Sequence, residues 1–189
     1  MYKTFHIVLL LLLTGLCASA QEAGVFNSPK GLGAELFLPS NPGSFFTATA
    51  YVDIYGIPTS RCKYPGFRVN VSRQFIIQQM QVQDIKLVFY VGPGLSAGFV
   101  RDHDKGRGID LGSLMSDNNG FMMALSADAG CHFDFGRFVG VDLSFLADAG
   151  LHIRRNEKET EYSATSVSIY NNGLWQLFYP QLTIYFKLR

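Results

Sequence analysis

The stretch "FVGVDLSFLADAGLHI", residues 138–153, alternates between apolar and polar side chains along almost its whole length. Successive side chains of a β-strand point to opposite faces of the sheet, so a repeat of two predicts a strand. The polar face carries Asp142 and Asp148, with Leu146 as its main exception. The apolar face consists of Val139, Val141, Leu143, Phe145, Ala147, Ala149, Leu151 and Ile153. This stretch alone leaves open which face meets water.

Six other stretches show the same alternation. They are "GLGAELFL" (31–38), "FFTATAYVDIYGI" (45–57), "GFRVNVSRQFII" (66–77), "IKLVFYVGPGLSAGFV" (85–100), "FMMALSADAGCHF" (121–133) and "LWQLFYPQLTIYFKL" (174–188). In each one, a row of apolar side chains opposes small or hydroxyl side chains, tyrosines and single charges. Arg73 is the charge that interrupts an apolar row. The sequence therefore predicts an all-β fold with seven clear strands.

The connections between these strands alternate in length after residue 79. The short segments "QVQD" (81–84) and "DFG" (134–136) alternate with the long segments 101–119 and 154–166. Outer-membrane barrels have long cell-facing loops and short periplasmic turns, so the alternation favours an antiparallel up-and-down barrel. Gly136 suits the left-handed position of a three-residue hairpin loop.

The usual even strand number of such barrels requires an eighth strand. One candidate is "SATSVSIY" (163–170), joined to the last strand by a turn at Asn171-Asn172-Gly173. The other candidate is the N-terminal segment "GVFNSPK" (24–30). We favour the first because its sequence makes the better strand, although it spoils the alternation of long and short connections.

Residues 1–20 have the features of a cleavable secretory signal peptide. Lys3 precedes the apolar run "HIVLLLLLTGL", and the small residues "ASA" precede Gln21, so we place cleavage after Ala20. A lipoprotein signal would instead lipidate Cys17, but the residue before it is Leu16 rather than a small one. Residues 21–189 are then one exported domain.

The composition excludes some classes of function. The chain has 16 basic and 15 acidic residues, a formal net charge of +1, and no basic patch, so we expect no nucleic-acid partner. Aromatic residues make up 14% of the chain, which is usual where aromatic rings line a membrane interface.

Three features favour a membrane barrel over a soluble sheet. Several apolar rows extend over about 13 to 16 residues, whereas a membrane strand needs about 9 to 11 and soluble strands average about 5 to 6. The side chains on the polar face are mostly small, which suits the narrow interior of an eight-stranded barrel. Both signs of charge occur on that face, and buried charges need partners. The predicted polar network in the lumen consists of Glu35, Asp53, Arg68, Lys86, Asp128, Asp142, Asp148 and Lys187.

Two expectations follow from this topology. If "DFG" closes a hairpin, Asp128 and Asp142 come roughly opposite each other and need a cation, which Lys86 or Arg68 would supply from neighbouring strands. The two cysteines of the exported chain are Cys62 and Cys131, which is beside "DFG", and they would lie at opposite ends of the barrel. We therefore expect no disulfide between them.

The chain from about Gln21 to Arg189 resembles the small outer-membrane β-barrel proteins of Gram-negative bacteria, in particular the porin-like barrels of the Bacteroides group. The resemblance is carried by the cleavage site followed by "QEAG", the alternating strands, "YVGPGLSAGFVRD" and the closing strand "FYPQLTIYFKLR". In that family the last strand is the signal for the barrel-assembly machinery and usually ends in an aromatic residue. Here Phe186 is followed by Lys-Leu-Arg. The resemblance implies an outer-membrane location and supplies no catalytic residues.

Motifs for chemistry are weak. "VGPGLSAG" (91–98) lacks the Lys-Ser/Thr of a phosphate loop, and "RDHDKGRGID" (101–110) lacks the frame of a calcium loop. His132 with Asp134, or His152 with a nearby serine, are the residues that a hydrolase would use, but no Ser/His/acid spacing stands out. We therefore expect no enzyme, no cofactor and no metal site.

The sequence thus predicts an integral outer-membrane barrel whose interior is plugged by polar side chains. Its role would be structural or would depend on the loops 101–119 and 154–165. Expected partners are outer-membrane lipid, the barrel-assembly machinery and an extracellular partner of the loops. Two alternatives stay open: a membrane-embedded hydrolase acting on lipid or protein, and a soluble secreted barrel that binds an apolar ligand.

Overall fold

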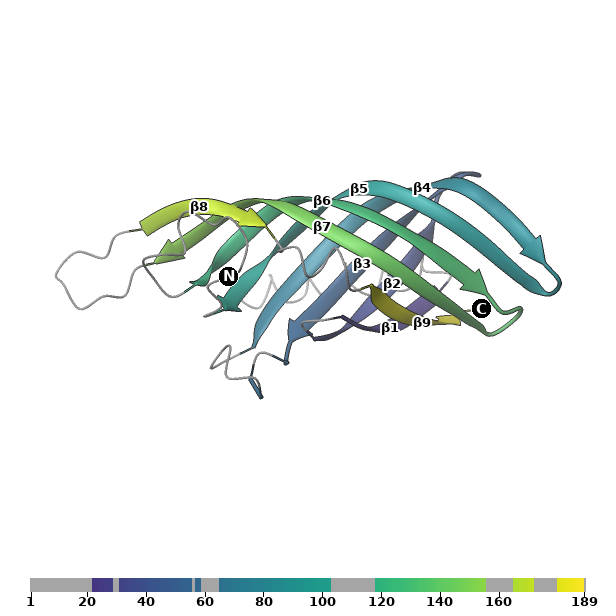
Figure 1. Ribbon diagram of the computed structural model, residues 1–189, viewed down its shortest axis with the longest axis horizontal. Helices are drawn as coiled ribbons and strands as arrows, with labels where there is room; N and C mark the ends of the chain where they lie inside the picture. Colours follow the sequence, from purple (N-terminus) through teal and green to yellow (C-terminus); the bar gives the residue numbers. More distant parts are fainter. Residues whose placement is uncertain are drawn as a thin grey trace, which may run out of the picture.

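The described part of the chain folds into one antiparallel sheet. The computed structural model describes residues 22–28, 31–55, 57–58, 65–102, 118–155, 165–171 and 180–188. The strands are β1 (Glu22–Asn27), β2 (Leu32–Pro39), β3 (Ser44–Asp53), β4 (Gly66–Val82), β5 (Ile85–Asp102), β6 (Asn118–Asp134), β7 (Val139–Arg155), β8 (Thr165–Asn171) and β9 (Gln181–Lys187). Consecutive strands pair from β1 to β7, and β9 pairs with both β7 and β1, so the sheet closes into a barrel-like ring (Figure 1). In these residues no helix has the length and apolar character needed to cross a membrane.

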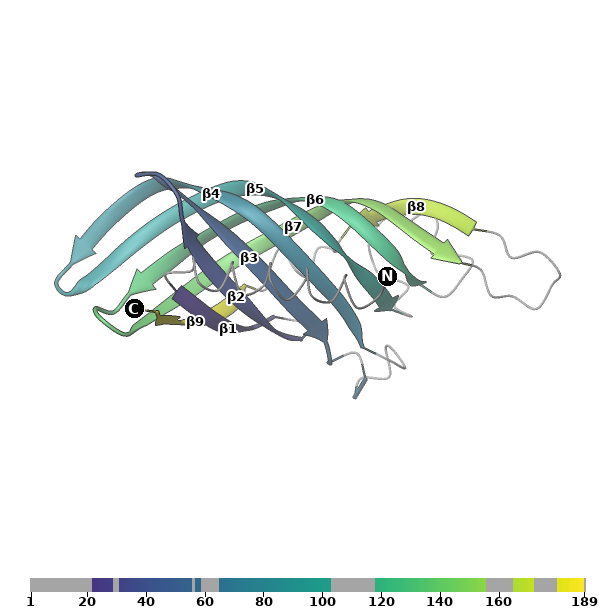
Figure 2. The ribbon, with the colours of Figure 1, turned by 180° about the vertical axis from the view of Figure 1, so that it is seen from behind.

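Two strands share the eighth position of the ring. β7 pairs with β8 through residues 149–155 and with β9 through residues 139–144. β8 and β9 therefore run in the same direction, one after the other, and the predicted hairpin between them is wrong. Closure requires a strand that pairs with both β2 and β9, and this strand is β1, the N-terminal candidate (Figure 2). Residues 172–179 lie outside the described part.

Four of the seven predicted strands lie close to their predicted ranges, and three differ at one end. β9 begins at Gln181, and residues 174–179 of its predicted range lie outside the described part. β3 ends at Asp53 rather than at residue 57, and β4 continues to Val82 rather than ending at residue 77. The turn before β5 is therefore tight and contains Gln83 at a φ of 55°. The glutamines between residues 78 and 83 conceal the end of β4, because they interrupt the apolar alternation.

The stagger of the ring follows from its pairing register. A walk around the ring along paired residues starts at one residue of β7 and returns to β7 ten residues further on. The steps are Gly140, Tyr185, Gly24, Glu35, Thr49, Asn70, Ser96, Ala124 and Gly150. Eight strand positions with this stagger give strands tilted by about 40° and a radius of about 8 Å. Side chains fill an interior of that width.

One end of the ring, which we call the short-turn end, carries the turns 40–43, 83–84 and 135–138. β1 begins and β9 ends there, since Glu22 pairs with Lys187. The connections 54–65, 103–117 and 156–164 join strands at the opposite end, so the predicted alternation of short and long connections is present. The hairpin of β4 and β5 projects furthest at the short-turn end (Figure 1). β3 begins at Ser44, opposite Phe75, while β4 continues for about 20 Å of strand beyond that point.

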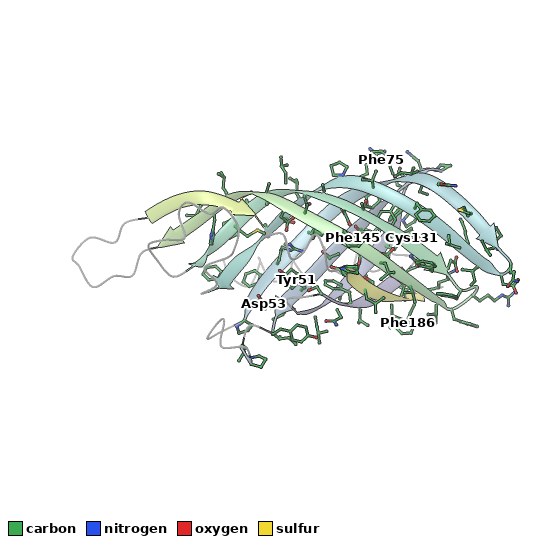
Figure 3. All side chains as sticks on the ribbon, viewed as in Figure 1. Tyr51, Asp53, Phe75, Cys131, Phe145 and Phe186 are labelled. Carbon is green, nitrogen blue, oxygen red and sulfur yellow. The ribbon has the colours of Figure 1, made fainter. Side chains whose placement is uncertain are left out.

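The exposed and buried faces of the ring are the reverse of those in a soluble protein. Long apolar side chains cover the outside, and Figure 3 shows Phe75 and Phe186 pointing away from the ring on opposite sides. Of the described residues, those buried most completely include Gln74, Thr47, Thr183 and Ser72. The interior is therefore polar and the exterior apolar.

The seam between β1 and β9 should be sensitive to added volume at Gly24. A Cβ atom there would lie 2.7 Å from Thr183 Cγ2 and 2.9 Å from Tyr185 Cδ1, and both neighbours are fully buried. We expect Gly24→Val to lower the free energy of unfolding by about 1 to 3 kcal/mol, measured from the urea midpoint. Ala23→Val, at the outward neighbour, is the control. Equal midpoints for the two variants would contradict this packing.

Candidate functional site

The polar interior is the candidate site, and strands β2 to β7 and β9 supply its buried polar side chains. Its buried polar side chains are Glu35, Ser44, Thr47, Arg68, Asn70, Ser72, Gln74, Ser96, Ser126, Asp128, His132, Asp142, Ser144, Asp148, His152, Gln181 and Thr183. They alternate with outward apolar residues on the same strands, so the period of two that forms the strands also selects the lining.

The half of the interior away from the short-turn end contains a buried ion pair. Arg68 of β4 donates through Nη1 to Asp148 of β7, across the ring. Ser96 Oγ donates to the same carboxylate at 2.8 Å. The Arg68 guanidinium also lies over the ring of Tyr51, 4.7 Å from its centroid. The pair is enclosed on both sides, because Arg68 is 6% and Asp148 is 3% exposed.

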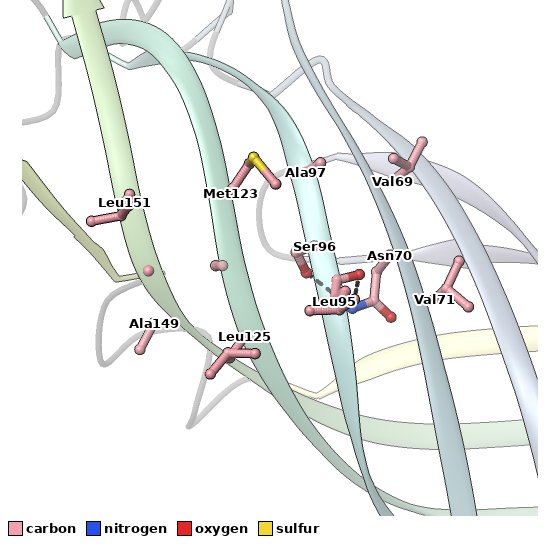
Figure 4. A pocket seen from close by; sticks show the side chains of 12 residues that line it. Val69, Asn70, Val71, Leu95, Ser96, Ala97, Met123, Leu125, Ala149 and Leu151 are labelled. Carbon is pink, nitrogen blue, oxygen red and sulfur yellow. Dashed lines mark hydrogen bonds between the residues drawn. The ribbon is translucent and has the colours of Figure 1, made fainter. Parts of the chain in front are cut away.

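Hydroxyl and amide side chains link the neighbouring strands next to this pair. Asn70 Nδ2 donates to Ser96 Oγ at 2.9 Å and to Ser126 Oγ at 2.6 Å, which connects β4, β5 and β6. Figure 4 shows the bond to Ser96, and it shows Val71 and Leu125 in the apolar outer groove across β4 to β7. The same strands thus carry a hydrogen-bonded inner face and an apolar outer face.

A second chain of contacts runs toward the short-turn end. Gln74 Nε2 donates to Ser72 Oγ at 2.7 Å and to Asp128 Oδ2 at 2.8 Å. Ser72 also shares a 2.7 Å hydrogen bond with Thr47 of β3. Gln74 Oε1 and Asp128 Oδ1 have no hydrogen-bond partner among the described residues. This part of the interior therefore holds more acceptors than donors.

Two residues of the last strand, β9, donate hydrogen bonds to Glu35 of β2. Gln181 Nε2 and Thr183 Oγ1 each donate to Glu35 Oε2 at 3.2 Å. Because β1 separates β2 from β9 in the ring, these bonds cross the interior behind the seam. They add side-chain contacts to the backbone pairing that closes the ring.

His132 lies between two carboxylates. Its Nε2 is 3.5 Å from Glu22 Oε2, and its Nδ1 is 3.7 Å from Asp142 Oδ2. Tyr90 donates from its hydroxyl to Asp142 Oδ1 at 2.8 Å. This arrangement holds the imidazole and the phenol in place. The described contacts of His132 do not include a serine hydroxyl.

Aromatic rings close the interior near the short-turn end. Phe37 stacks on Phe45 with 4.3 Å between centroids, and Phe45 contacts Tyr90 edge-on at 5.2 Å. The His132 ring contacts Tyr185 at 5.3 Å. Because Phe45, Tyr90 and Tyr185 are each at most 4% exposed, these side chains fill the cross-section.

The eight residues of the predicted network fall into two groups. Glu35, Arg68, Asp128, Asp142 and Asp148 are buried inside the ring. Asp53 is partly exposed at the last position of β3, and Lys187 is partly exposed at the short-turn end. Lys187 Nζ donates to Asp134 Oδ1 and to the Gly136 carbonyl oxygen, each at 2.6 Å. Lys86 is exposed on the projecting hairpin.

The predicted pairing of Asp128 with Asp142 is wrong. Asp128 pairs in register with Leu146, and Asp142 pairs with His132. Asp134 pairs with Gly140, so the hairpin is centred on residue 137 rather than on residue 135, and moving the centre by two residues shifts the register by four. Gly136 lies in this turn at a φ of 84°. Neither Lys86 nor Arg68 lies between the two carboxylates, because Lys86 is exposed and Arg68 contacts Asp148.

Other predicted features lie elsewhere in the fold. Cys131 is a free thiol on β6 near the short-turn end (Figure 3), whereas Cys62 lies outside the described residues. The connection that contains Cys62 joins Asp53 to Gly66 at the opposite end of the ring. "VGPGLSAG" lies within β5, and residues 103–117, with most of the charged loop, are outside the described part.

Several interior residues were not predicted from the sequence as members of the network. Gln74, Tyr90 and Thr183 lie on the polar face of their strands, and the period of two assigns each of them to the interior. Their partners depend on the register across strands, which a single strand pattern does not contain.

The described residues hold no group of three or more His, Cys, Asp or Glu side chains placed to bind a metal ion. A comparison with protein-family models gave no match, and neither did a comparison with curated proteins.

Proposed function

We propose that the chain is an integral outer-membrane β-barrel protein, exported by its first twenty residues, with a plugged lumen. Its role would be structural or would depend on partners bound by the loops at the end opposite the short-turn end. The reversed distribution of side chains supports this proposal most directly. Exposed large apolar residues such as Val71, Leu95 and Leu125 cover the outside, at 54%, 65% and 69% exposure, while carboxylates and amides are buried inside. A soluble barrel that binds an apolar ligand needs the opposite arrangement.

The height of the apolar surface also fits a bilayer. On β4 the outward side chains from Phe67 to Ile77 are apolar except for Arg73. The ten residue steps from Phe67 to Ile77 span about 33 Å along the strand and, at a tilt of about 40°, about 25 Å along the ring axis. Barrels of the bacterial outer membrane have an apolar band of about 25 Å.

The polar interior explains how such a fold holds buried charges. Each strand pairs on both sides within the closed part of the ring, which removes the exposed edges that a bilayer does not tolerate. The carboxylates then find hydrogen-bond donors across the lumen, as at Asp148 and Glu35. Because aromatic side chains fill the short-turn half, we expect the purified protein to give no steady conductance in planar bilayers.

Fractionation tests the membrane location. We expect the full-length protein, expressed in a Gram-negative host, to stay in the outer-membrane fraction after carbonate extraction and to require detergent for release. Unheated samples should migrate differently from boiled samples on a denaturing gel, as a closed barrel does. Release by carbonate alone would contradict the proposal.

A further inference from the structure

The outer face of the ring carries one feature that an apolar belt does not explain, Arg73. Arg73 is exposed on β4, in the outward row that contains Val71 and Phe75. It is the one charged residue among the described side chains that point outward between the two ends of the ring. A charged side chain on the lipid face is costly in the middle of a bilayer and is tolerated near the headgroups.

The register fixes how far Arg73 lies from the short-turn end. Arg73 pairs with Phe46, and β3 begins two residues earlier, at Ser44. Its side chain therefore starts two residues from the end of the β3–β4 pairing and four residues from Ile77, the last residue of the outward apolar row. A long arginine side chain can reach the interface from such a position while its methylene groups stay in contact with apolar neighbours.

Two aromatic rings hold the Arg73 guanidinium on this surface. Its Cζ atom lies 5.2 Å from the centroid of Phe75 and 5.7 Å from that of Phe46. Phe75 is two residues nearer the short-turn end, so the contact directs the guanidinium toward that edge. The described residues include no carboxylate paired with Arg73, and its forked donors are open on the lipid side.

We propose that Arg73, seated between Phe46 and Phe75, binds the phosphate of a membrane phospholipid in the leaflet at the short-turn end. This inference rests on the membrane location proposed above. The planar guanidinium donates two parallel hydrogen bonds to phosphate oxygens, a geometry that an ammonium group does not provide. The bound lipid would then fix the depth of the ring, with the apolar row on one side of Arg73 and the projecting hairpin on the other.

Native mass spectrometry of the full-length mature protein in detergent can test this site. The probes are phosphatidylglycerol, a diacylglycerol with the same acyl chains, and inorganic phosphate. We expect wild-type protein to retain phosphatidylglycerol about tenfold better than Arg73→Gln, the loss expected for one charge-assisted contact. Arg73→Lys should retain an intermediate amount, because it keeps the charge and loses the fork. Lys86→Gln, on the projecting hairpin, should retain as much lipid as wild type.

Three outcomes would overturn the proposal. These are equal retention by wild type and Arg73→Gln, equal retention of diacylglycerol and phosphatidylglycerol, and displacement of the lipid by an equal concentration of inorganic phosphate. The last result would assign Arg73 to free phosphate instead. Carbonate extraction of Arg73→Gln separates this proposal from the membrane location. Extraction of the wild-type protein itself would contradict the location, whereas loss of lipid with normal fractionation would leave the location intact.

Discussion

Val71→Arg is expected to prevent most of the protein from inserting into lipid vesicles. Val71 is 54% exposed and points outward near the middle of the apolar surface on β4. An arginine on the lipid face near the bilayer centre costs about 2 to 4 kcal/mol, whereas a surface substitution in a soluble protein changes stability by about 0.5 kcal/mol or less. The inserted fraction can be measured by the gel shift between unheated and boiled samples after refolding into vesicles.

Val82→Arg is the matched control for this substitution. Val82 is 51% exposed and ends β4 on the projecting hairpin, beyond the start of β3. The same change of side chain there should leave the inserted fraction close to that of wild type. If both variants insert equally well, the outer face does not contact lipid at Val71, and the proposed membrane location is wrong.

The second large effect is expected at the buried ion pair. Arg68→Met removes the cation from Asp148, whose carboxylate is 3% exposed and also accepts a hydrogen bond from Ser96. Removing one partner of a buried pair costs about 3 to 5 kcal/mol, because the other charge stays desolvated. We expect a correspondingly lower urea midpoint for unfolding in vesicles or detergent.

Two comparisons separate the burial of the charge from other effects of this substitution. Lys187→Met breaks the pair with Asp134, where each side chain is 24% exposed, and should cost about 1 kcal/mol or less. The double variant Arg68→Met with Asp148→Leu should recover part of the loss, because it removes the carboxylate that Arg68→Met leaves without its cation. An equal loss for the Lys187 and Arg68 variants would show that solvent screens both pairs alike.

The alternation in the sequence predicted the strands and the direction of most side chains. "FVGVDLSFLADAGLHI" is β7 with its first residue in the turn, and Asp142 and Asp148 point inward as the period of two requires. That prediction needs only the geometry of one strand. The end of β4 was missed because polar glutamines continue the backbone pairing without continuing the apolar row.

The contacts between strands could not be predicted in the same way. Moving a turn by two residues leaves every side chain on its own face but changes its partner by four residues, which replaced Asp128 by His132 opposite Asp142. The eighth strand was predicted only in part, for a related reason. Strand propensity favoured "SATSVSIY", which forms β8 beside β7, but closure of the ring depends on a segment that pairs on both sides, and the six residues of β1 do so.

The pairing of Glu22 with Lys187 has a consequence for the order of folding. It joins residues at the beginning and the end of the described chain, so the two residues are separated by nearly the whole described sequence. Contacts this distant in sequence form slowly, because the entropy of bringing the ends together is lost before any pairing is gained. The hairpins β4–β5 and β6–β7 are local and can form first. Synthesis of the chain through β9 must therefore precede the last folding step, and any truncation before β9 should leave an open sheet with two unpaired edges.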